Sequence, residues 1–170
     1  MEGIVFSEQQ RFRQWWLWFI FLGINGMFLT GVFKQVVGGQ QFGNQPMSNT
    51  GLLISVSLSL LITILFVILR LETRIDDKGI YVRFYPFHIS FKYYPWESIS
   101  RANVRKYSPV MEYGGWGLRF GLMGNGAAFN VSGNQGLQLV FNNGQKLLIG
   151  THKPEELKQV LNILAKDKAF

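Results

Sequence analysis

The chain contains no cysteine and only two histidines, which limits the kinds of catalytic and metal-binding site that it can form. Without cysteine there is no disulfide bond, no thiolate nucleophile and no cysteine-ligated metal. His88 and His152 lie far apart in the sequence, which argues against a zinc site. The serines follow no nucleophile-elbow pattern, and no pair of carboxylates has catalytic spacing. The sequence therefore predicts neither an enzyme nor a bound cofactor or metal.

Charge is missing from two long stretches near the start of the chain, Trp15–Phe33 and Gly51–Leu69. As helices, each would extend about 28 Å, close to the hydrocarbon thickness of a bilayer. We therefore expect a transmembrane hairpin over residues 15–70, with helices at about 15–37 and 51–70. The alternative for the first run is a cleaved signal peptide. The run is longer and more aromatic than the usual signal core, which favours a retained helix.

The hairpin contains one amide and several hydroxyl groups among its apolar residues. Asn25 lies in the first run, and Ser55, Ser57, Ser59 and Thr63 lie in the second. Small and hydroxyl side chains let membrane helices pack closely and share hydrogen bonds. One polar residue without a buried charge is too little for an ion path. Asn25 is therefore predicted to be a helix–helix contact.

The basic residues around the hairpin predict its orientation. Arg11 and Arg13 precede the first run, Arg70 and Arg74 follow the second, and residues 38–50 between them carry no charge. Cytoplasmic flanks are the ones enriched in arginine and lysine. Both termini are thus expected in the cytoplasm of a cell with the hairpin in its inner (plasma) membrane. Residues 1–14 then form a short cytoplasmic segment.

Residues 71–170 have the composition of a water-soluble domain with a basic surplus. They hold thirteen Lys and Arg residues against eight Asp and Glu residues, a net charge of +5. A basic domain tied to a membrane has anionic lipid headgroups as its nearest partner. The charges form no dense run, which argues against nucleic acid.

The same region alternates between short extended segments and turns, and ends in a helical pattern. Leu157, Val160, Leu161 and Leu164 repeat at helical spacing after Pro154, which predicts a helix over 154–166 with these four side chains buried. The Asn143-Gly144 pair predicts a tight hairpin turn. Seven segments are rich in β-branched and aromatic residues: 80–84, 89–94, 99–107, 118–122, 127–131, 137–141 and 146–149.

About seven antiparallel strands and one C-terminal helix predict a small, bent α+β barrel with the helix over its open end. Four segments add a resemblance: Ile75–Ile80, Tyr94–Ile99, Glu112–Arg119 and Ile149–Leu157. With the hairpin before them, the chain resembles bacterial membrane-anchored proteins with a pleckstrin-homology-like domain. The resemblance implies this fold, a membrane location, and a role in scaffolding or in contact with lipid or protein.

One predicted strand carries a basic group. Arg101 and Arg105 share a face of the strand, and Lys106 follows them. These three residues are candidates for contact with anionic lipid, with Arg83 and Lys92 beside them. The alternative is an ordinary solvated strand face.

The segment Gly114–Gly136 holds eight glycines, but it does not match a phosphate-binding loop. No helix follows its glycine pairs, and the third glycine is misplaced or missing. Glycines here are better explained by bends in a small barrel. Trp116 is expected either to fill the core or to anchor in the membrane interface or in a partner. Arg119 is expected either to bind an anion or to pair with Glu112 or Glu97, so Trp116 and Arg119 are the candidate ligand or partner loop.

These features together predict a membrane-anchored, non-enzymatic binding or scaffold module. Its expected partners are membrane lipids, a second copy, or another membrane protein. The alternative is an accessory subunit of a membrane transport or export complex.

Overall fold

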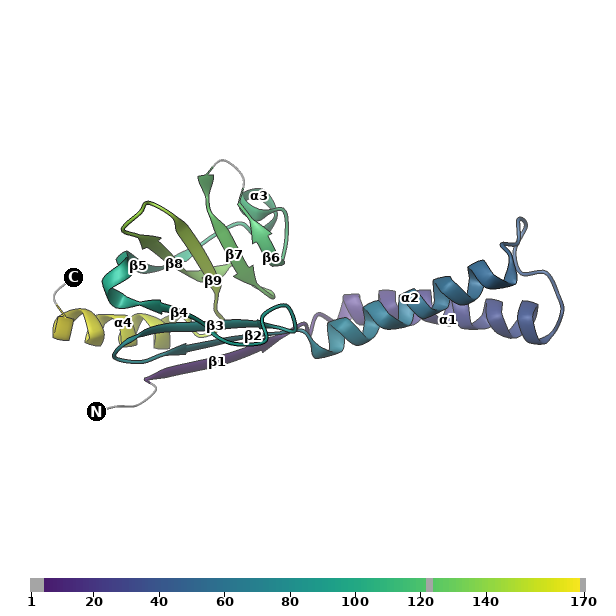
Figure 1. Cartoon of the computed structure of the whole chain (residues 1–170), viewed down its shortest axis with the longest axis horizontal. Coiled ribbons are helices and arrows are strands. Elements are labelled where there is room, and N and C mark those ends of the chain that lie inside the picture. The colour runs from purple at the N-terminus through teal and green to yellow at the C-terminus, as the bar shows by residue number, and fades with distance from the viewer. Residues whose placement is uncertain (1–4, 122–123, 169–170) are drawn as a thin grey trace. The chain divides into compact units, whose positions relative to one another are not determined.

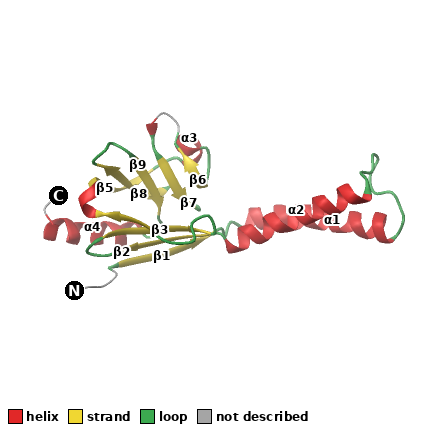
Figure 2. Cartoon of the chain, in the orientation of Figure 1, coloured by secondary structure: helices red, strands yellow, loops and turns green. Residues whose placement is uncertain are grey.

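A computed structural model of the chain describes residues 5–121 and 124–168, with side chains up to residue 165 (Figures 1 and 2). The chain folds into two compact units. Arg13–Ile68 form one, and the segments before and after them, up to Phe12 and from Leu69, form the other. The second unit is therefore discontinuous in sequence, and the first is inserted into it.

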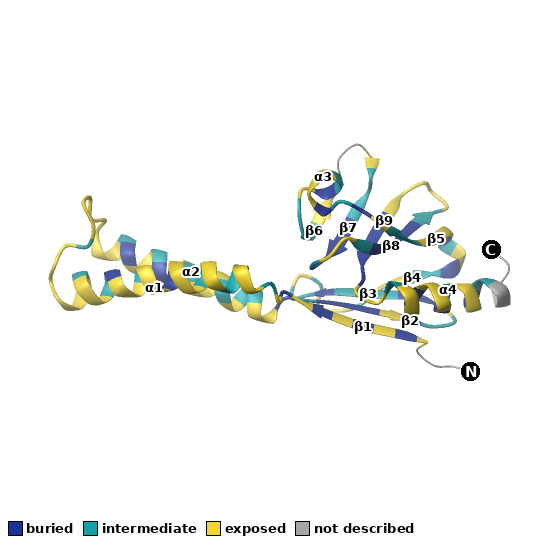
Figure 3. Cartoon of the chain, turned by 180° about the vertical axis from the view of Figure 1, so that it is seen from behind, coloured by how far each residue is buried: buried dark blue, intermediate teal, exposed yellow. Residues whose placement is uncertain are grey.

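The inserted unit is a helical hairpin. Its elements are α1 (Trp15–Gly31), a π-helical end (Val32–Val37) and α2 (Asn49–Ile68). Both helical segments, Trp15–Val37 and Asn49–Ile68, are long and apolar enough to cross a membrane, and most of their side chains are exposed (Figure 3). The expected second helix is about two residues shorter at its C-terminal end, because Arg70 already belongs to a strand.

Polar side chains join the two helices at the predicted position. Asn25 is buried, and its Nδ2 donates to Thr63 Oγ1 at 2.8 Å. Ser59 Oγ donates to Asn25 Oδ1 at 3.0 Å. The prediction of a helix–helix contact at Asn25 is confirmed.

The discontinuous unit begins with an antiparallel sheet in the order β1-β2-β3-β4. Its strands are β1 (Phe6–Arg11), β2 (Arg70–Ile75), β3 (Gly79–Tyr85) and β4 (Lys92–Pro95). The separate cytoplasmic segment expected over residues 1–14 is therefore wrong for residues 6–11, which form an edge strand of the domain. Residues 86–91, partly expected as strand, form the β3–β4 loop.

The inner face of β1 explains why its sequence does not look like a strand. Glu8 and Gln10 are buried there, where apolar residues would be expected. Gln10 Nε2 donates to the Gly150 carbonyl at 2.6 Å, and the two Glu8 oxygens accept from Thr151 Oγ1 and from the His152 N–H. Polar contacts with a segment about 140 residues away thus replace apolar burial.

The second sheet has the order β5-β8-β9-β7-β6. Its strands are β5 (Ile99–Lys106), β6 (Gly117–Phe120), β7 (Ala127–Asn130), β8 (Gln135–Phe141) and β9 (Lys146–Gly150). The predicted turn joins β8 and β9, with Gly144 at φ 79°. β7 and β9 run parallel, so the expected all-antiparallel order is wrong for this pair, which alternation alone does not reveal. Leu122, expected at the end of β6, lies outside the described residues.

The described strands form two sheets, which do not close into a barrel, and not the single small, bent barrel that is expected from the sequence. The break falls between β4 and β5, at the short 3-10 turn Trp96–Ser98. Pro95 ends β4 because it has no N–H to donate. The buried Trp96 then fastens the turn, since its Nε1 donates to the Asp76 carbonyl at 3.0 Å.

Aromatic contacts and the last helix hold the two sheets together. The rings of Tyr94 and Phe141 lie 5.4 Å apart, and His88 packs on Phe129 at 5.3 Å. Helix α4 (Pro154–Lys168) contacts β5, β8 and β1. Three of its four predicted core residues are buried: Leu157, Val160 and Leu164. Leu161 is only half-buried, so its predicted full burial is wrong; it turns toward a small groove of about 280 Å³ beside β5.

Candidate functional site

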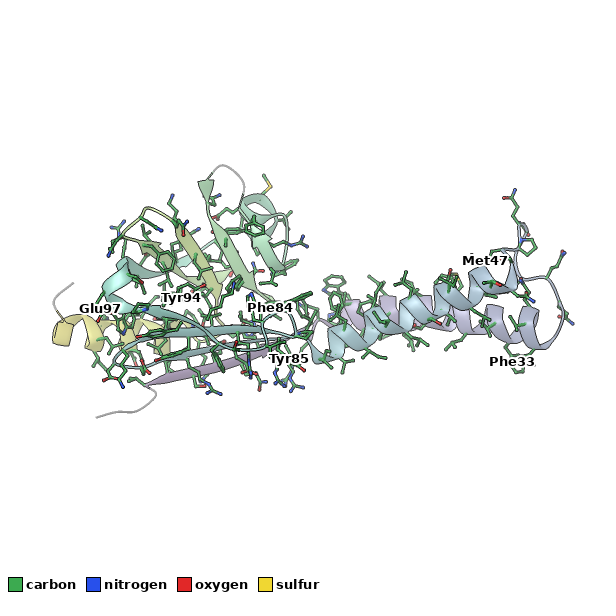
Figure 4. All side chains as sticks on the ribbon, in the orientation of Figure 1. Phe33, Met47, Phe84, Tyr85, Tyr94 and Glu97 are labelled. Carbon is green, nitrogen blue, oxygen red and sulfur yellow. The ribbon has the colours of Figure 1, made fainter. Side chains whose placement is uncertain are left out.

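The outer face of the first sheet carries a group of arginines. Successive side chains of β2 and β3 point to opposite faces of the sheet, so that Phe84 points into the domain and Tyr85 out of it (Figure 4). Side chains of the outer parity line up across the ladder in rows. We call the four arginines on this side the arginine face: Arg11, Arg70, Arg74 and Arg83.

A single carboxylate lies in the middle of the arginine face. Glu72 is buried there, and its Oε2 accepts from Arg83 Nη2 at 2.5 Å. Its Oε1 lies 2.6 Å from Arg70 Nε. Two guanidinium groups thus share one carboxylate, which fixes their positions without neutralising both.

Aromatic rings support the same guanidinium groups. Arg74 and Arg83 each lie 4.5 Å from the centroid of the Phe91 ring, and Arg70 lies 4.8 Å from that of Tyr85. A cation over an aromatic ring is attracted by the ring quadrupole, and a planar guanidinium can stack there while its N–H groups stay free at the edge. The rings therefore hold the arginines extended on the surface.

The charge of this surface is unbalanced. Four arginines stand against Glu72, so four minus one leaves a net charge of +3. Arg11 and Arg74 are exposed, and neither pairs with a carboxylate in the part of the chain that the structure describes. Guanidinium groups bind phosphate oxygens through paired N–H donors. The arrangement is thus suited to anionic phosphate groups.

The arginine face begins at the end of the sheet that leads to the hairpin, with Arg11 and Arg70. Arg83 lies one outward row further along the sheet, and Arg74 lies in the row after that, toward the β2–β3 turn. Arg11 pairs with Arg70, and Arg70 with Tyr85, in one row of the ladder. Only Leu69 separates β2 from α2, and only residues 12–14 separate β1 from α1. The opposite end of the sheet is the β2–β3 turn, which contains Asp76 and Asp77.

The structure separates the three basic residues predicted on β5. Arg101 and Lys106 are exposed. Arg105 instead belongs to a partly buried network, in which its Nη2 donates to Glu112 Oε2 at 2.7 Å and its Nε donates to Gln138 Oε1 at 3.1 Å. The hydrogen bond with Arg105 is the main cause that lowers the pKa of Glu112, and the same bond raises the pKa of Arg105. Arg105 is thus engaged inside the domain and does not point to a ligand.

Trp116 and Arg119 lie together but form no pocket with a charged partner. Trp116 is half-buried and does not fill the core; its Nε1 donates to the Gly133 carbonyl at 3.2 Å. Arg119 is exposed, and its Nε donates to the Trp116 carbonyl at 3.0 Å. The expected ion pair of Arg119 with Glu112 is not formed, because Arg105 occupies that carboxylate.

One nucleophile–base contact was missed by the sequence reasoning. Ser132 Oγ lies 2.6 Å from His152 Nε2 on the surface. Catalytic pairs of this kind need a third group that orients the histidine ring. The nearby Glu8 carboxylate binds the backbone N–H of His152 and Thr151 Oγ1 instead. Among the described residues, no cluster of three or more His, Cys, Asp and Glu side chains could hold a metal ion.

The sequence contains a pattern that predicts the β2 part of the arginine face. Arg70, Glu72 and Arg74 alternate with Leu71, Thr73 and Ile75, which is the period of a strand with one polar face. Arg70 and Arg74 also fit the charge pattern that predicts the orientation of the hairpin, so they do not stand out as part of a surface. Their partners on β1 could not be found in this way, since the whole hairpin lies between the two strands.

Comparison of the chain with protein-family models, with curated proteins and with solved structures gave no match.

Proposed function

We propose that the protein is a membrane-anchored, non-enzymatic binding module whose arginine face binds the phosphate groups of anionic lipids beside its own anchor. The observation that carries the proposal is a surface of four arginines with one carboxylate among them, which starts with Arg11 and Arg70 at the sheet end joined to both apolar helices and extends to Arg74. A domain held at an anionic surface gains about 1 kcal/mol for each well-placed basic residue.

The pairing of β1 with β2 supports a hairpin that crosses the membrane twice. The two strands form six consecutive residue pairs, from Phe6 with Ile75 to Arg11 with Arg70. Such a ladder requires the two flanks of the hairpin to be on one side of the bilayer. A single crossing would put them on opposite sides. The charge pattern then favours the cytoplasmic side, because Arg11, Arg13 and Arg70 lie on the two flanks of the hairpin, while its connecting loop, residues 38–50, carries no charge.

The lipids that remain bound to the purified full-length protein test this proposal. The protein is extracted in mild detergent from a membrane containing phosphatidylglycerol, and bound lipid is measured by native mass spectrometry. The double variant Arg11→Gln/Arg74→Gln should retain less phosphatidylglycerol than the wild type. The control Arg101→Gln/Lys106→Gln removes the same charge from exposed positions on β5 and should retain as much as the wild type. Equal losses in both variants would contradict a dedicated arginine face.

The second candidate function is an accessory subunit of a membrane transport or export complex. The hairpin favours it in two ways. An apolar groove of about 710 Å³ runs along it, lined mainly by side chains of α1 together with Leu60 and Thr63. Gly23 and Gly26 have no neighbouring atoms where a side chain would lie, so a smooth part of α1 is not packed against α2. A stoichiometric membrane protein that copurifies in mild detergent would favour this function over the first.

A further inference from the structure

We propose that the β3–β4 loop, residues 86–91, inserts the side chains of Phe87 and Ile89 into the interface of the bilayer that holds the hairpin. The inference rests on the proposed function, because it takes the hairpin to lie in a bilayer. It adds an apolar contact to the electrostatic contact of the arginine face, and the two contacts are tested separately below.

The loop exposes its apolar side chains to an unusual degree. Ile89 is 82% exposed and Phe87 is 58% exposed. Burying apolar side chains of this size is favourable, because it removes apolar surface from water. An apolar pair at the tip of a loop is consistent with burial in something other than the domain.

The loop is held in this conformation from inside. His88 lies between the two exposed residues but turns inward, where its ring packs on Phe129. The His88 N–H donates to the Phe84 carbonyl at 2.8 Å, and the Phe84 N–H donates to His88 Nδ1 at 3.3 Å. Arg83 Nη1 donates to the Ile89 carbonyl at 3.3 Å. Phe87 and Ile89 are therefore presented outward by a fixed loop, which lowers the entropy lost on insertion.

The ladder register puts the loop at the sheet end that leads to the hairpin. Tyr85, the last residue of β3, pairs with Arg70, and the loop begins at the next residue. Two residue steps join Arg70 to Ile68 at the end of α2, and four join Arg11 to Trp15 at the start of α1. An extended chain of these lengths spans at most about 7 Å and about 14 Å. The loop thus starts within a short chain distance of both points where the chain enters the apolar helices.

The charges next to the loop fit a headgroup layer. Arg74 and Arg83 both contact the ring of Phe91 at the end of the loop, and the exposed Lys92 follows it. An apolar tip with basic residues behind it matches the interface of a bilayer, where acyl chains lie below the phosphate groups. The occupant proposed for this tip is therefore a lipid surface.

A single fluorescent label in the full-length protein tests the insertion directly. Because the chain lacks cysteine, Ile89→Cys creates a unique site for an environment-sensitive dye. The matched control is Val5→Cys, an exposed apolar position whose N–H donates to the Ile75 carbonyl at the opposite end of the same sheet. Both proteins are reconstituted in vesicles of phosphatidylcholine, with and without phosphatidylglycerol.

The dye at position 89 should emit at shorter wavelength than the dye at position 5. Quencher groups on the lipid chains should reduce the emission of the dye at position 89 and not that of the dye at position 5. This result is expected in both kinds of vesicle, and it should persist in the Arg11→Gln/Arg74→Gln background, because apolar burial does not depend on lipid charge. A dye at position 89 that is as open to aqueous iodide as the dye at position 5 would overturn the inference. The inference would also be overturned if the dye at position 89 were inserted only in vesicles that contain phosphatidylglycerol, or only in the protein that keeps Arg11 and Arg74. Loss of anionic-lipid binding with insertion retained would contradict the proposed arginine face and leave the loop assignment standing.

Discussion

Arg11 and Arg70 are direct partners across the β1–β2 ladder, although the entire apolar hairpin lies between them in the sequence. The hairpin is thus inserted where a β-turn would otherwise connect two antiparallel strands. This relationship makes the domain discontinuous and brings the arginine face together from both sides of the insertion.

Replacing residues 13–68 by Asn-Gly should give a folded, water-soluble domain. Phe12 and Leu69 are the next positions beyond the Arg11–Arg70 pair, and a two-residue Asn-Gly turn closes antiparallel strands of this twist. Circular dichroism should show a cooperative thermal transition. Residues 71–170 alone lack β1 and the Glu8 contacts with Thr151 and His152, so they should unfold at lower temperature or aggregate. Equal stability of the two proteins would mean that β1 is dispensable.

In this shortened protein, Arg105→Gln should lower the free energy of unfolding by about 1–2 kcal/mol, because it leaves the partly buried Glu112 without its charged partner. Arg101→Gln, at an exposed position on the same strand, should stay within about 0.5 kcal/mol of the parent. Urea unfolding measures both. If Arg105→Gln left the free energy of unfolding unchanged, the ion pair with Glu112 would not be important for stability, and Arg105 would again be a candidate for contact with a ligand.

The C-terminal helix offers a matched pair of leucines. Leu157 is 1% exposed, so Leu157→Ala should cost about 2–5 kcal/mol in unfolding free energy. Leu161 is half-buried beside an open groove, so Leu161→Ala should cost clearly less, about 1 kcal/mol. The reverse order in urea unfolding would show that α4 is rotated from its position in the structure.

His88 should make the domain less stable in mild acid. Burial lowers the pKa of His88 from its usual value of 6.5, and the charge of Lys92 acts in the same direction. As the pH falls below about 6.5, the unfolded chain takes up a proton before the folded one does, so stability is lost until the folded His88 is protonated too. Protonation also removes the Nδ1 acceptor used by the Phe84 N–H.

The variant His88→Asn keeps an acceptor near the Nδ1 position but does not titrate. Its melting temperature should therefore fall less than that of the wild type between pH 7.5 and pH 5.5. The difference between the two falls is the part of the acid sensitivity that the titration of His88 causes. Identical slopes in the two proteins would place the source of the acid sensitivity elsewhere.

The sequence predicted those parts of the fold that depend on neighbouring residues. The uncharged runs, the Asn-Gly turn and the spacing of Leu157, Val160 and Leu164 all correspond to elements of the structure. Each is a local pattern of period or turn chemistry. The pleckstrin-homology-like assignment stays a prediction.

What the sequence did not predict depends on distant partners. The inner face of β1 is polar, and its hydrogen bonds are made with residues 150–152, so no local apolar pattern marks it as a strand. Arg105 does not belong to an exposed basic group on β5, because it pairs with Glu112. The short helix α3 (Pro109–Tyr113) brings Glu112 back beside Arg105. The arginine face exists only once β1, β2 and β3 are paired in register.

Vesicle binding by the shortened protein, with residues 13–68 replaced by Asn-Gly, tests the central claim most directly. Binding to vesicles containing phosphatidylglycerol is measured for the parent, for Arg11→Gln/Arg74→Gln and for Arg101→Gln/Lys106→Gln. The first variant should bind roughly 30-fold more weakly, since two basic residues contribute about 1 kcal/mol each, and the second should bind like the parent. Binding of the parent should weaken as salt shortens the Debye length from about 10 Å at 0.1 M. Equal weakening by both variants, or a larger effect at Arg101 and Lys106, would contradict the arginine face as the surface that meets the membrane.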